Sequence, residues 1–294
     1  MQNNSRLFSF ILFFVASTVL AEEWHSLADQ QTLSISGIAT IDRDRFLVVH
    51  DNKKSDQPRL SIVNWQNKQR PTLSPIKWCD QSLPIDLEAI TAIPDHKNDY
   101  LVLESKGKVS RIQLDPDKIA CKTIAQFEIP TATPQSNMEG LALHCIKKHC
   151  LLAWAERGDD KTPAKFSWSG FNIEKNRLKK SPNSSFNFKA PYPETDLRSI
   201  SDIAIDNEGA VWVSASSDPG DDGFFKSALY KMGSFTKKSK WLPSKKITSA
   251  ATYESEDIKI EALLFTPSGL IMATDDEKKG AKIAISVRLW KFNF

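Results

Sequence analysis

A short phrase that returns five times constrains this chain more than any other feature of its sequence. In the clearest copy, residues 137–143 read Asn-Met-Glu-Gly-Leu-Ala-Leu, so an acid opens a run of small and branched apolar residues. Two further copies open with glutamate and two with serine, at residues 88–92, 261–265, 36–40 and 201–205. The opening residues Ser36, Glu88, Glu139, Ser201 and Glu261 are separated by 52, 51, 62 and 60 residues. The sequence is therefore built from five similar units.

Each unit continues with the same order of events. A polar turn follows the phrase, and then come a second apolar run, a third strand and a more polar fourth strand. The second runs are residues 46–49, 100–103, 150–154, 211–213 and 270–273. The third strands are expected at 60–65, 109–114, 166–173, 229–232 and 281–287, and the fourth at 72–78, 121–129, 185–189 and 247–253. Four-stranded units at this period predict an all-β propeller.

Five blades fit the five copies of the phrase. Small residues such as Gly37, Ala89 and Gly140 are expected where neighbouring sheets crowd near the axis of the ring. A sixth, degenerate blade is the alternative, because residues 24–35 and 288–294 could pair and close the ring. Closure of either kind removes the open sheet edge that would otherwise invite aggregation.

The first residues predict a secretory signal peptide spanning residues 1–21. Residues 7–20 are almost wholly apolar, and Ala21 stands before two glutamates, which is typical of a cleavage site. An uncleaved anchor is the alternative, although a membrane span needs roughly 20 apolar residues. Residues 22–294 then form a single propeller domain that lacks a further transmembrane span, located in the periplasm or secreted.

Four cysteines in an exported chain favour disulfides. Cys145 and Cys150 stand between two apolar runs, where a bond would join the arms of a hairpin, and this leaves Cys79 to pair with Cys121. Two other connectivities and free thiols stay open at this point.

The charge balance excludes one class of partner. The chain has 39 Lys and Arg against 36 Asp and Glu, which is not the clustered basic face of a nucleic-acid-binding protein. The sequence also lacks a Gly-X-Ser-X-Gly elbow, a phosphate-binding loop and a Cys-X-X-Cys metal motif. The expected partner is an unknown small molecule or protein, and a monomer is favoured over an oligomer.

Carboxylates are the candidate functional groups. The innermost strand of each blade lines the channel of a propeller, so Glu88, Glu139 and Glu261 are expected to face one axis. Other acids end the second strands and are expected around one rim, together with a histidine: Glu104, Glu156, Asp275, Asp51, Asp218 and His50. Oxygen ligands of this kind suit Ca²⁺ better than Mg²⁺ or Mn²⁺.

Two other roles are open for these acids. Each glutamate alone could accept backbone N–H bonds at a strand end. Lys106 and Arg157 follow Glu104 and Glu156, and we expect them to pair with these acids or to receive an anionic ligand.

The Glu-[Ala/Gly]-[Ile/Leu] phrase in an exported chain of this size resembles the SdiA-regulated and the phytase-like (esterase-like) groups of bacterial propellers. This resemblance implies calcium binding and points to Glu88, Glu139 and Glu261. The Asp-Asp-Pro phrase of true propeller phytases is absent here. Residues 201–212 also look like a strand pair of the gluconolactonase-like lactonases, but Ser201 stands where those enzymes have a metal-binding Asp.

These observations predict an exported calcium-binding propeller that binds a ligand or a partner. The alternative is a metal-dependent hydrolase of phosphoesters, esters or lactones, in which the same acids hold the metal and a bound water attacks. A third possibility is an interaction platform that uses only the outer faces. The sequence does not decide whether the chain is an enzyme.

Overall fold

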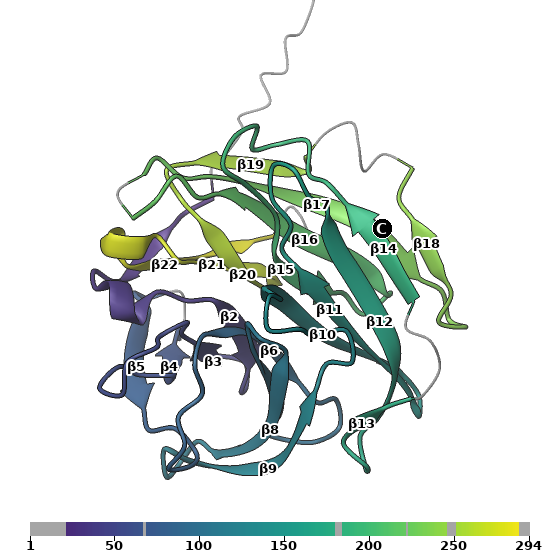
Figure 1. Cartoon of the computed structure of the whole chain (residues 1–294). Helices are drawn as coiled ribbons and strands as arrows, with labels where there is room; N and C mark the ends of the chain where they lie inside the picture. Colours follow the sequence, from purple (N-terminus) through teal and green to yellow (C-terminus); the bar gives the residue numbers. More distant parts are fainter. Residues whose placement is uncertain (1–21, 67–68, 180–183, 222, 246–250, 288–294) are drawn as a thin grey trace, which may run out of the picture.

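A computed structural model describes residues 22–66, 69–179, 184–221, 223–245 and 251–287, and its sheets are arranged in a ring (Figure 1). The signal peptide predicted at residues 1–21 and the segment 288–294 lie outside the described residues. Each sheet runs from an innermost strand at the axis to an outer strand at the rim. No helix within the described residues is long and apolar enough to cross a membrane.

The first two blades contain four antiparallel strands each, in chain order from the axis outward. The first blade consists of β2 (Gly37–Thr40), β3 (Arg45–Val49), β4 (Leu60–Asn64) and β5 (Thr72–Ile76). The second consists of β6 (Leu87–Ala92), β7 (Asp99–Glu104), β8 (Lys108–Asp115) and β9 (Ala120–Glu128). Because consecutive strands pair, short turns suffice to connect them.

The third and fourth blades have an interrupted outer strand. The third consists of β10 (Met138–Ile146), β11 (His149–Glu156), β12 (Ala164–Asn172), β13 (Arg177–Leu178) and β14 (Ser184–Phe188), and both last strands pair with β12. The fourth consists of β15 (Leu197–Ile205), β16 (Ala210–Ser217), β17 (Lys226–Phe235), β18 (Trp241–Pro243) and β19 (Tyr253–Glu256). Of the strand expected at 247–253, residues 247–250 lie outside the described residues. The described strand β19 starts at Tyr253, and its polar, half-exposed residues give little pattern.

The fifth blade is closed by the N-terminal segment. It consists of β20 (Ile260–Thr266), β21 (Gly269–Thr274), β22 (Ala281–Ser286) and, as outer strand, β1 (His25–Ala28), where His25 lies opposite Ile283. Five blades are therefore confirmed, and the alternative of a sixth was wrong. Residues near the N-terminus complete the fifth sheet because the outer edge of β22 needs hydrogen-bond partners. Short 3-10 turns, η1 (Gln31–Leu33) and η2 (Glu277–Lys279), flank this closure.

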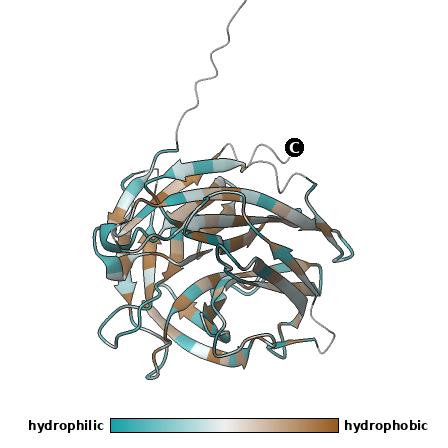
Figure 2. Cartoon of the chain, turned by 45° about the horizontal axis from the view of Figure 1, so that its top comes forward, coloured by the Kyte–Doolittle hydropathy of each residue, from teal (hydrophilic) through white to brown (hydrophobic). Residues whose placement is uncertain are grey.

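Apolar side chains fill the spaces between neighbouring blades. One cluster joins Leu47 and Val49 of the first blade to Ile90 and Val102 of the second. The inner strands are buried on both faces, whereas the outer strands alternate between hydrophobic and hydrophilic residues, as the colours in Figure 2 show. At Gly37 a Cβ atom would lie 2.9 Å from Cα of Ala89. The crowding predicted near the axis is therefore real, and it explains the small residues there.

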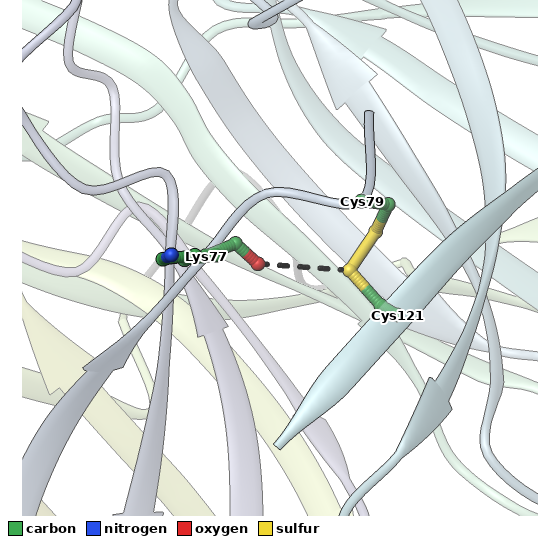
Figure 3. Close-up of a disulfide and its surroundings, with 3 residues drawn as sticks. All are labelled: Lys77, Cys79 and Cys121. Atoms are coloured by element: carbon green, nitrogen blue, oxygen red, sulfur yellow. Dashed lines mark hydrogen bonds between the residues drawn. A yellow bond between two sulfur atoms is a disulfide. The ribbon is translucent and has the colours of Figure 1, made fainter. Parts of the chain in front are cut away.

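Both predicted disulfides are present. The bond between Cys145 and Cys150 joins opposite residues of β10 and β11, as a hairpin staple does. The bond between Cys79 and Cys121 joins the segment after β5 to β9, so it connects the rims of the first two blades (Figure 3).

Candidate functional site at the mouth of the channel

Three β-bulges place the glutamates of the repeated phrase. The pairing of β6 with β7 passes from Leu87 to Ala89, so Glu88 is left without a partner in the ladder. The same break leaves out Glu139 in β10 and Glu261 in β20. A bulge inserts one residue and redirects its side chain, and bulges are common at barrel rims. The sequence predicted the acids, but it did not reveal the bulges that orient them.

The three glutamates converge at one end of the channel. Apolar segments of the inner strands enclose a cavity of about 80 Å³ along the axis, and each glutamate lies two residues before the segment of its own strand. Glu88 is exposed to the negative charges of Glu139, Asp86, Asp51 and Glu261. We call this end the channel mouth, and define it by eight residues: Asp51, Asp86, Glu88, Glu139, Arg198, Lys259, Glu261 and Asp275.

Basic side chains neutralise one side of the channel mouth. Arg198 Nη1 lies 3.2 Å from Glu261 Oε1, and Lys259 Nζ lies 3.3 Å from the same oxygen. Lys259 is almost fully buried and also pairs with Asp275 at 3.3 Å and with Glu277 at 2.6 Å. Burial lowers the pKa of this lysine, but the surrounding acids raise it by more. The lysine therefore stays charged and holds several carboxylates together.

Further ion pairs extend this network. Arg198 pairs through Nη2 with Asp218, the acid predicted at the end of the second strand of the fourth blade. Arg157 pairs with Glu139 at 3.5 Å, so our expectation that it pairs with Glu156 was wrong. Burial raises the pKa of Asp275. Lys259 and hydrogen bonds lower it by a larger amount, so the net pKa lies below the ordinary value.

The other side of the channel mouth is acidic. Within the described residues Glu88 has no ion pair, although its side chain is only 9% exposed. Burial, and then the neighbouring carboxylates, raise the pKa of Glu88 well above its ordinary value. The same causes raise the pKa of Asp51 to about 7. Among the described residues, the one cation in ion-pair distance of Asp51, Asp86 or Glu88 is the exposed Lys53, whose Nζ lies 3.0 Å from Asp86.

Two of the predicted rim acids, Glu104 and Glu156, have structural partners. Glu104 Oε2 accepts a hydrogen bond from the Ile85 amide, and Glu156 Oε1 accepts one from the Ser136 hydroxyl, so both fasten the loop entering their blade. Lys106 donates to the Ser136 carbonyl and does not pair with Glu104, which corrects the second expected pair.

His50 is also committed to the fold. Its ring nitrogens contact the Ser34 carbonyl at 2.6 Å and the Ser61 hydroxyl at 2.7 Å. Burial lowers the pKa of His50 to about 4, so the imidazole is neutral at physiological pH. A metal could bind this histidine only after one of these hydrogen bonds breaks.

The residues present do not form a ready cation cage. Within the described part of the chain, no group of three or more His, Cys, Asp or Glu side chains is arranged to hold a metal ion. Two of the three glutamates already pair with basic side chains. Calcium binding therefore stays a prediction.

Sequence reasoning missed three charged residues of this site, of which Lys259 and Asp202 are buried and Arg198 is half-buried. Lys259 stands between two isoleucines, and this charge between apolar residues was a usable signal, whereas Arg198 lies among mainly polar residues and gave none. Asp202 was noted only as part of the phrase. Its carboxylate accepts hydrogen bonds at 2.7 Å from the Leu263 amide of the next blade and from the Ile203 amide. Burial raises its pKa well above the ordinary value, and its bonds connect two inner strands.

Comparisons with known proteins show the fold alone. No family model matches this chain, and no curated protein matches it. Among solved structures, the chain is similar to an exo-1,5-alpha-L-arabinanase from a bovine ruminal metagenomic library, with a TM-score of 0.53, 10% identity, and coverage of 86% of this chain and 92% of that one. It is also similar to a GH43_12 protein from a capybara gut metagenome, with a TM-score of 0.50 and 11% identity. That match covers 92% of this chain and 54% of the other.

Proposed function

We propose that this chain is an exported β-propeller that binds a small polyhydroxylated ligand, such as a saccharide, at the channel mouth. The observation that carries the proposal is that the channel mouth has an acidic side and a basic side. Glu88 lacks an ion pair within the described residues, while Arg198 and Lys259 belong to the other side of the channel mouth. A hydroxyl group both donates and accepts hydrogen bonds. A polyol can therefore donate to the acidic side and accept from the basic side.

The names of the structural neighbours add support for this ligand class. An arabinanase and a GH43_12 protein share the fold at very low identity. Charged groups in a desolvated setting are costly to maintain, which favours a functional role for them over a purely structural one.

Calorimetric titration with a panel of arabino- and xylo-oligosaccharides tests this proposal. For an oligosaccharide that binds the wild type, Glu88→Gln should weaken binding at least tenfold. The amide replaces one carboxyl oxygen with an NH₂ group, which cannot accept a hydrogen bond. Glu174→Gln, on the exposed turn after β12, is the matched control and should bind like the wild type. If no saccharide binds, or if Glu88→Gln binds as the wild type does, the proposal fails.

Hydrolysis of such a ligand is a second candidate, favoured by one specific observation. At the channel mouth the pKa of Glu88 is raised and that of Asp275 is lowered, and such divergence separates an acid from a base. Glycosidases use a carboxylic acid to protonate the leaving oxygen and a carboxylate on the other side of the sugar. Release of reducing sugar that is lost in Glu88→Gln and in Asp275→Asn would support hydrolysis. Binding without release would restrict the chain to the binding function.

Calcium binding and export belong to the same proposal. The acids that would hold a cation are Asp51, Glu88 and Asp86, and Asp86 would have to exchange its contacts with Lys53 and Ser105 for it. The metal-dependent hydrolysis of phosphoesters, esters or lactones depends on that cation. Export is supported by both disulfides, which form in oxidising compartments. Mass spectrometry of the exported protein tests the processing, and a mature chain that starts at Glu22 is expected.

A further inference from the structure

A second cavity lies outside the channel, against the outer part of the first blade. It has a volume of about 690 Å³. Its walls come from η1, from the loop before β4 and from the segment after β5, and include Thr32, Gln57, Arg59, Lys77 and Trp78. None of the eight residues of the channel mouth lines it, so it is a separate site.

Arg59 gives this cavity its chemistry. The side chain is 2% exposed, yet no carboxylate within the described residues lies in ion-pair distance of it. Its Nε donates to the Pro84 carbonyl at 2.6 Å, and its Nη1 donates to the Gln57 carbonyl at 2.9 Å. A guanidinium has five N–H donors, so three remain, on Nη1 and Nη2. Asp51 and Glu104 act on Arg59 only from beyond ion-pair distance, so an anion that enters the cavity would be its first direct ion partner among the described residues.

The walls of the cavity are held in place before any ligand binds. Asn52 Nδ2 donates to the carbonyls of Thr32 and Pro58, which ties η1 to the loop before β4. Gln57 Oε1 accepts hydrogen bonds from the Lys53 and Lys54 amides and closes the same loop. The carbonyl of Gln57 in turn orients Arg59. A preorganised site loses less entropy on binding.

We infer that this cavity binds a small organic carboxylate that carries a flat ring. The remaining N–H groups of Arg59 at Nη1 and Nη2 form a fork that matches a planar carboxylate. Trp78 is partly buried in the wall and offers an apolar surface for the ring. Lys77 lines the cavity beside Trp78, and two exposed acids, Asp56 and Asp80, also line it, so the attraction for an anion comes from Arg59 and not from the net charge of the walls.

Ligand-observed ¹⁹F NMR with 4-fluorobenzoate tests this inference, with the uncharged 4-fluorobenzamide as the matched probe. The wild type should broaden the benzoate signal at least twofold more than the benzamide signal. Arg59→Lys keeps the charge but removes the fork, and Trp78→Ala removes the ring surface, so each should return the benzoate line width toward that of free ligand. Arg177→Lys, on the exposed β13, should behave as the wild type does.

The inference is wrong if acid and amide broaden equally, or if both Arg59→Lys and Trp78→Ala leave the benzoate signal as in the wild type. Thermal unfolding checks that each variant is folded. If Arg59→Lys does not fold, the two probes and Trp78→Ala still decide the result. Glu88→Gln should leave the benzoate signal unchanged, which separates this site from the channel mouth.

Discussion

The two sides of the channel mouth start from the same repeated phrase and end in different electrostatic surroundings. Glu261 in the fifth blade faces Arg198 and Lys259 at 3.2 and 3.3 Å. Glu88 in the second blade occupies the equivalent bulge, but the charges that act on it most strongly are carboxylates. Burial raises the pKa of both acids. The two cations oppose this rise at Glu261, whose pKa is about 8, whereas the neighbouring carboxylates add to it at Glu88.

This difference separates a structural role from a functional one. On the paired side, the cations stabilise their carboxylates, and the network joins β15 to β20 and β21. On the acidic side, the raised pKa of Glu88 is not relieved by any ion pair within the described residues. A ligand stabilises a site most where buried polar groups have no protein partner. This favours the acidic side as the place where a ligand makes its decisive contacts.

The largest effect is expected from removing the central cation of the paired side. Lys259→Met should lower the free energy of unfolding by about 3–5 kcal/mol, because it leaves several buried carboxylates without their partner. Urea unfolding at neutral pH measures this change. Lys118→Met, which breaks the exposed pair with Asp115, should leave the free energy of unfolding nearly unchanged. If Lys259→Met costs no more than this control, the paired side does not depend on its cations.

A smaller effect is expected from calcium, and it concerns the acidic side alone. At a calcium concentration of about 100 times the dissociation constant, a single site should add about 2.7 kcal/mol to the free energy of unfolding. Thermal unfolding of chelator-treated protein, with and without calcium, measures the gain. Glu88→Gln should remove it and Glu174→Gln should not. Identical unfolding curves with and without calcium would end the calcium proposal.

The sequence predicted the positions of the acids better than their surroundings. The period of the phrase predicted five blades, and the apolar runs predicted most strands, because burial on both faces leaves a strong signal. The pairing of the closing strand β1 with β22 was not predicted, because it joins residues from opposite ends of the chain.

The same limit applies to the site. That Glu88, Glu139 and Glu261 share one ring followed from the repeat. The choice of Glu139 rather than Glu156 as the partner of Arg157 depends on a bulge and a side-chain direction that no local pattern encodes. Lys259 was visible as a charge between two isoleucines, but Arg198 lies among mainly polar residues, and only the fold shows that both reach Glu261.

A pH titration of stability compares the two sides directly. The folded state holds protons on Glu88 and Asp51 at pH values where the unfolded chain has released them, so stability falls as pH rises from about 4 through the raised pKa, which is about 7 for Asp51. Glu88→Gln removes its share of this loss. The variant should therefore be more stable than the wild type between pH 5 and 8, and this gain should shrink as the pH falls toward 4.

The control for this titration comes from the paired side. Burial also raises the pKa of Glu261, to about 8, so Glu261→Gln removes a proton effect of the same sign as Glu88→Gln does. It also loses the bonds to Arg198 and Lys259, and this loss should make it less stable than the wild type at pH 7. His50, whose pKa is lowered to about 4, destabilises the fold as pH falls from 6.5, but it does so equally in all variants and cancels in the difference. If Glu88→Gln and Glu261→Gln change stability in the same direction, the two sides are not electrostatically distinct.

The smallest effect is expected from Lys53, the cation nearest to the acidic side. Its side chain is 64% exposed and its Nζ lies 3.0 Å from Asp86. An exposed pair of this kind contributes about 0.2–1 kcal/mol, and 1 M salt should screen it. A double-mutant cycle of Lys53→Met with Asp86→Asn measures the coupling at low and high salt. A coupling above about 2 kcal/mol that persists in salt would mean that Lys53 neutralises the acids as Lys259 does, and Glu88 would then have no more need of a ligand than Glu261.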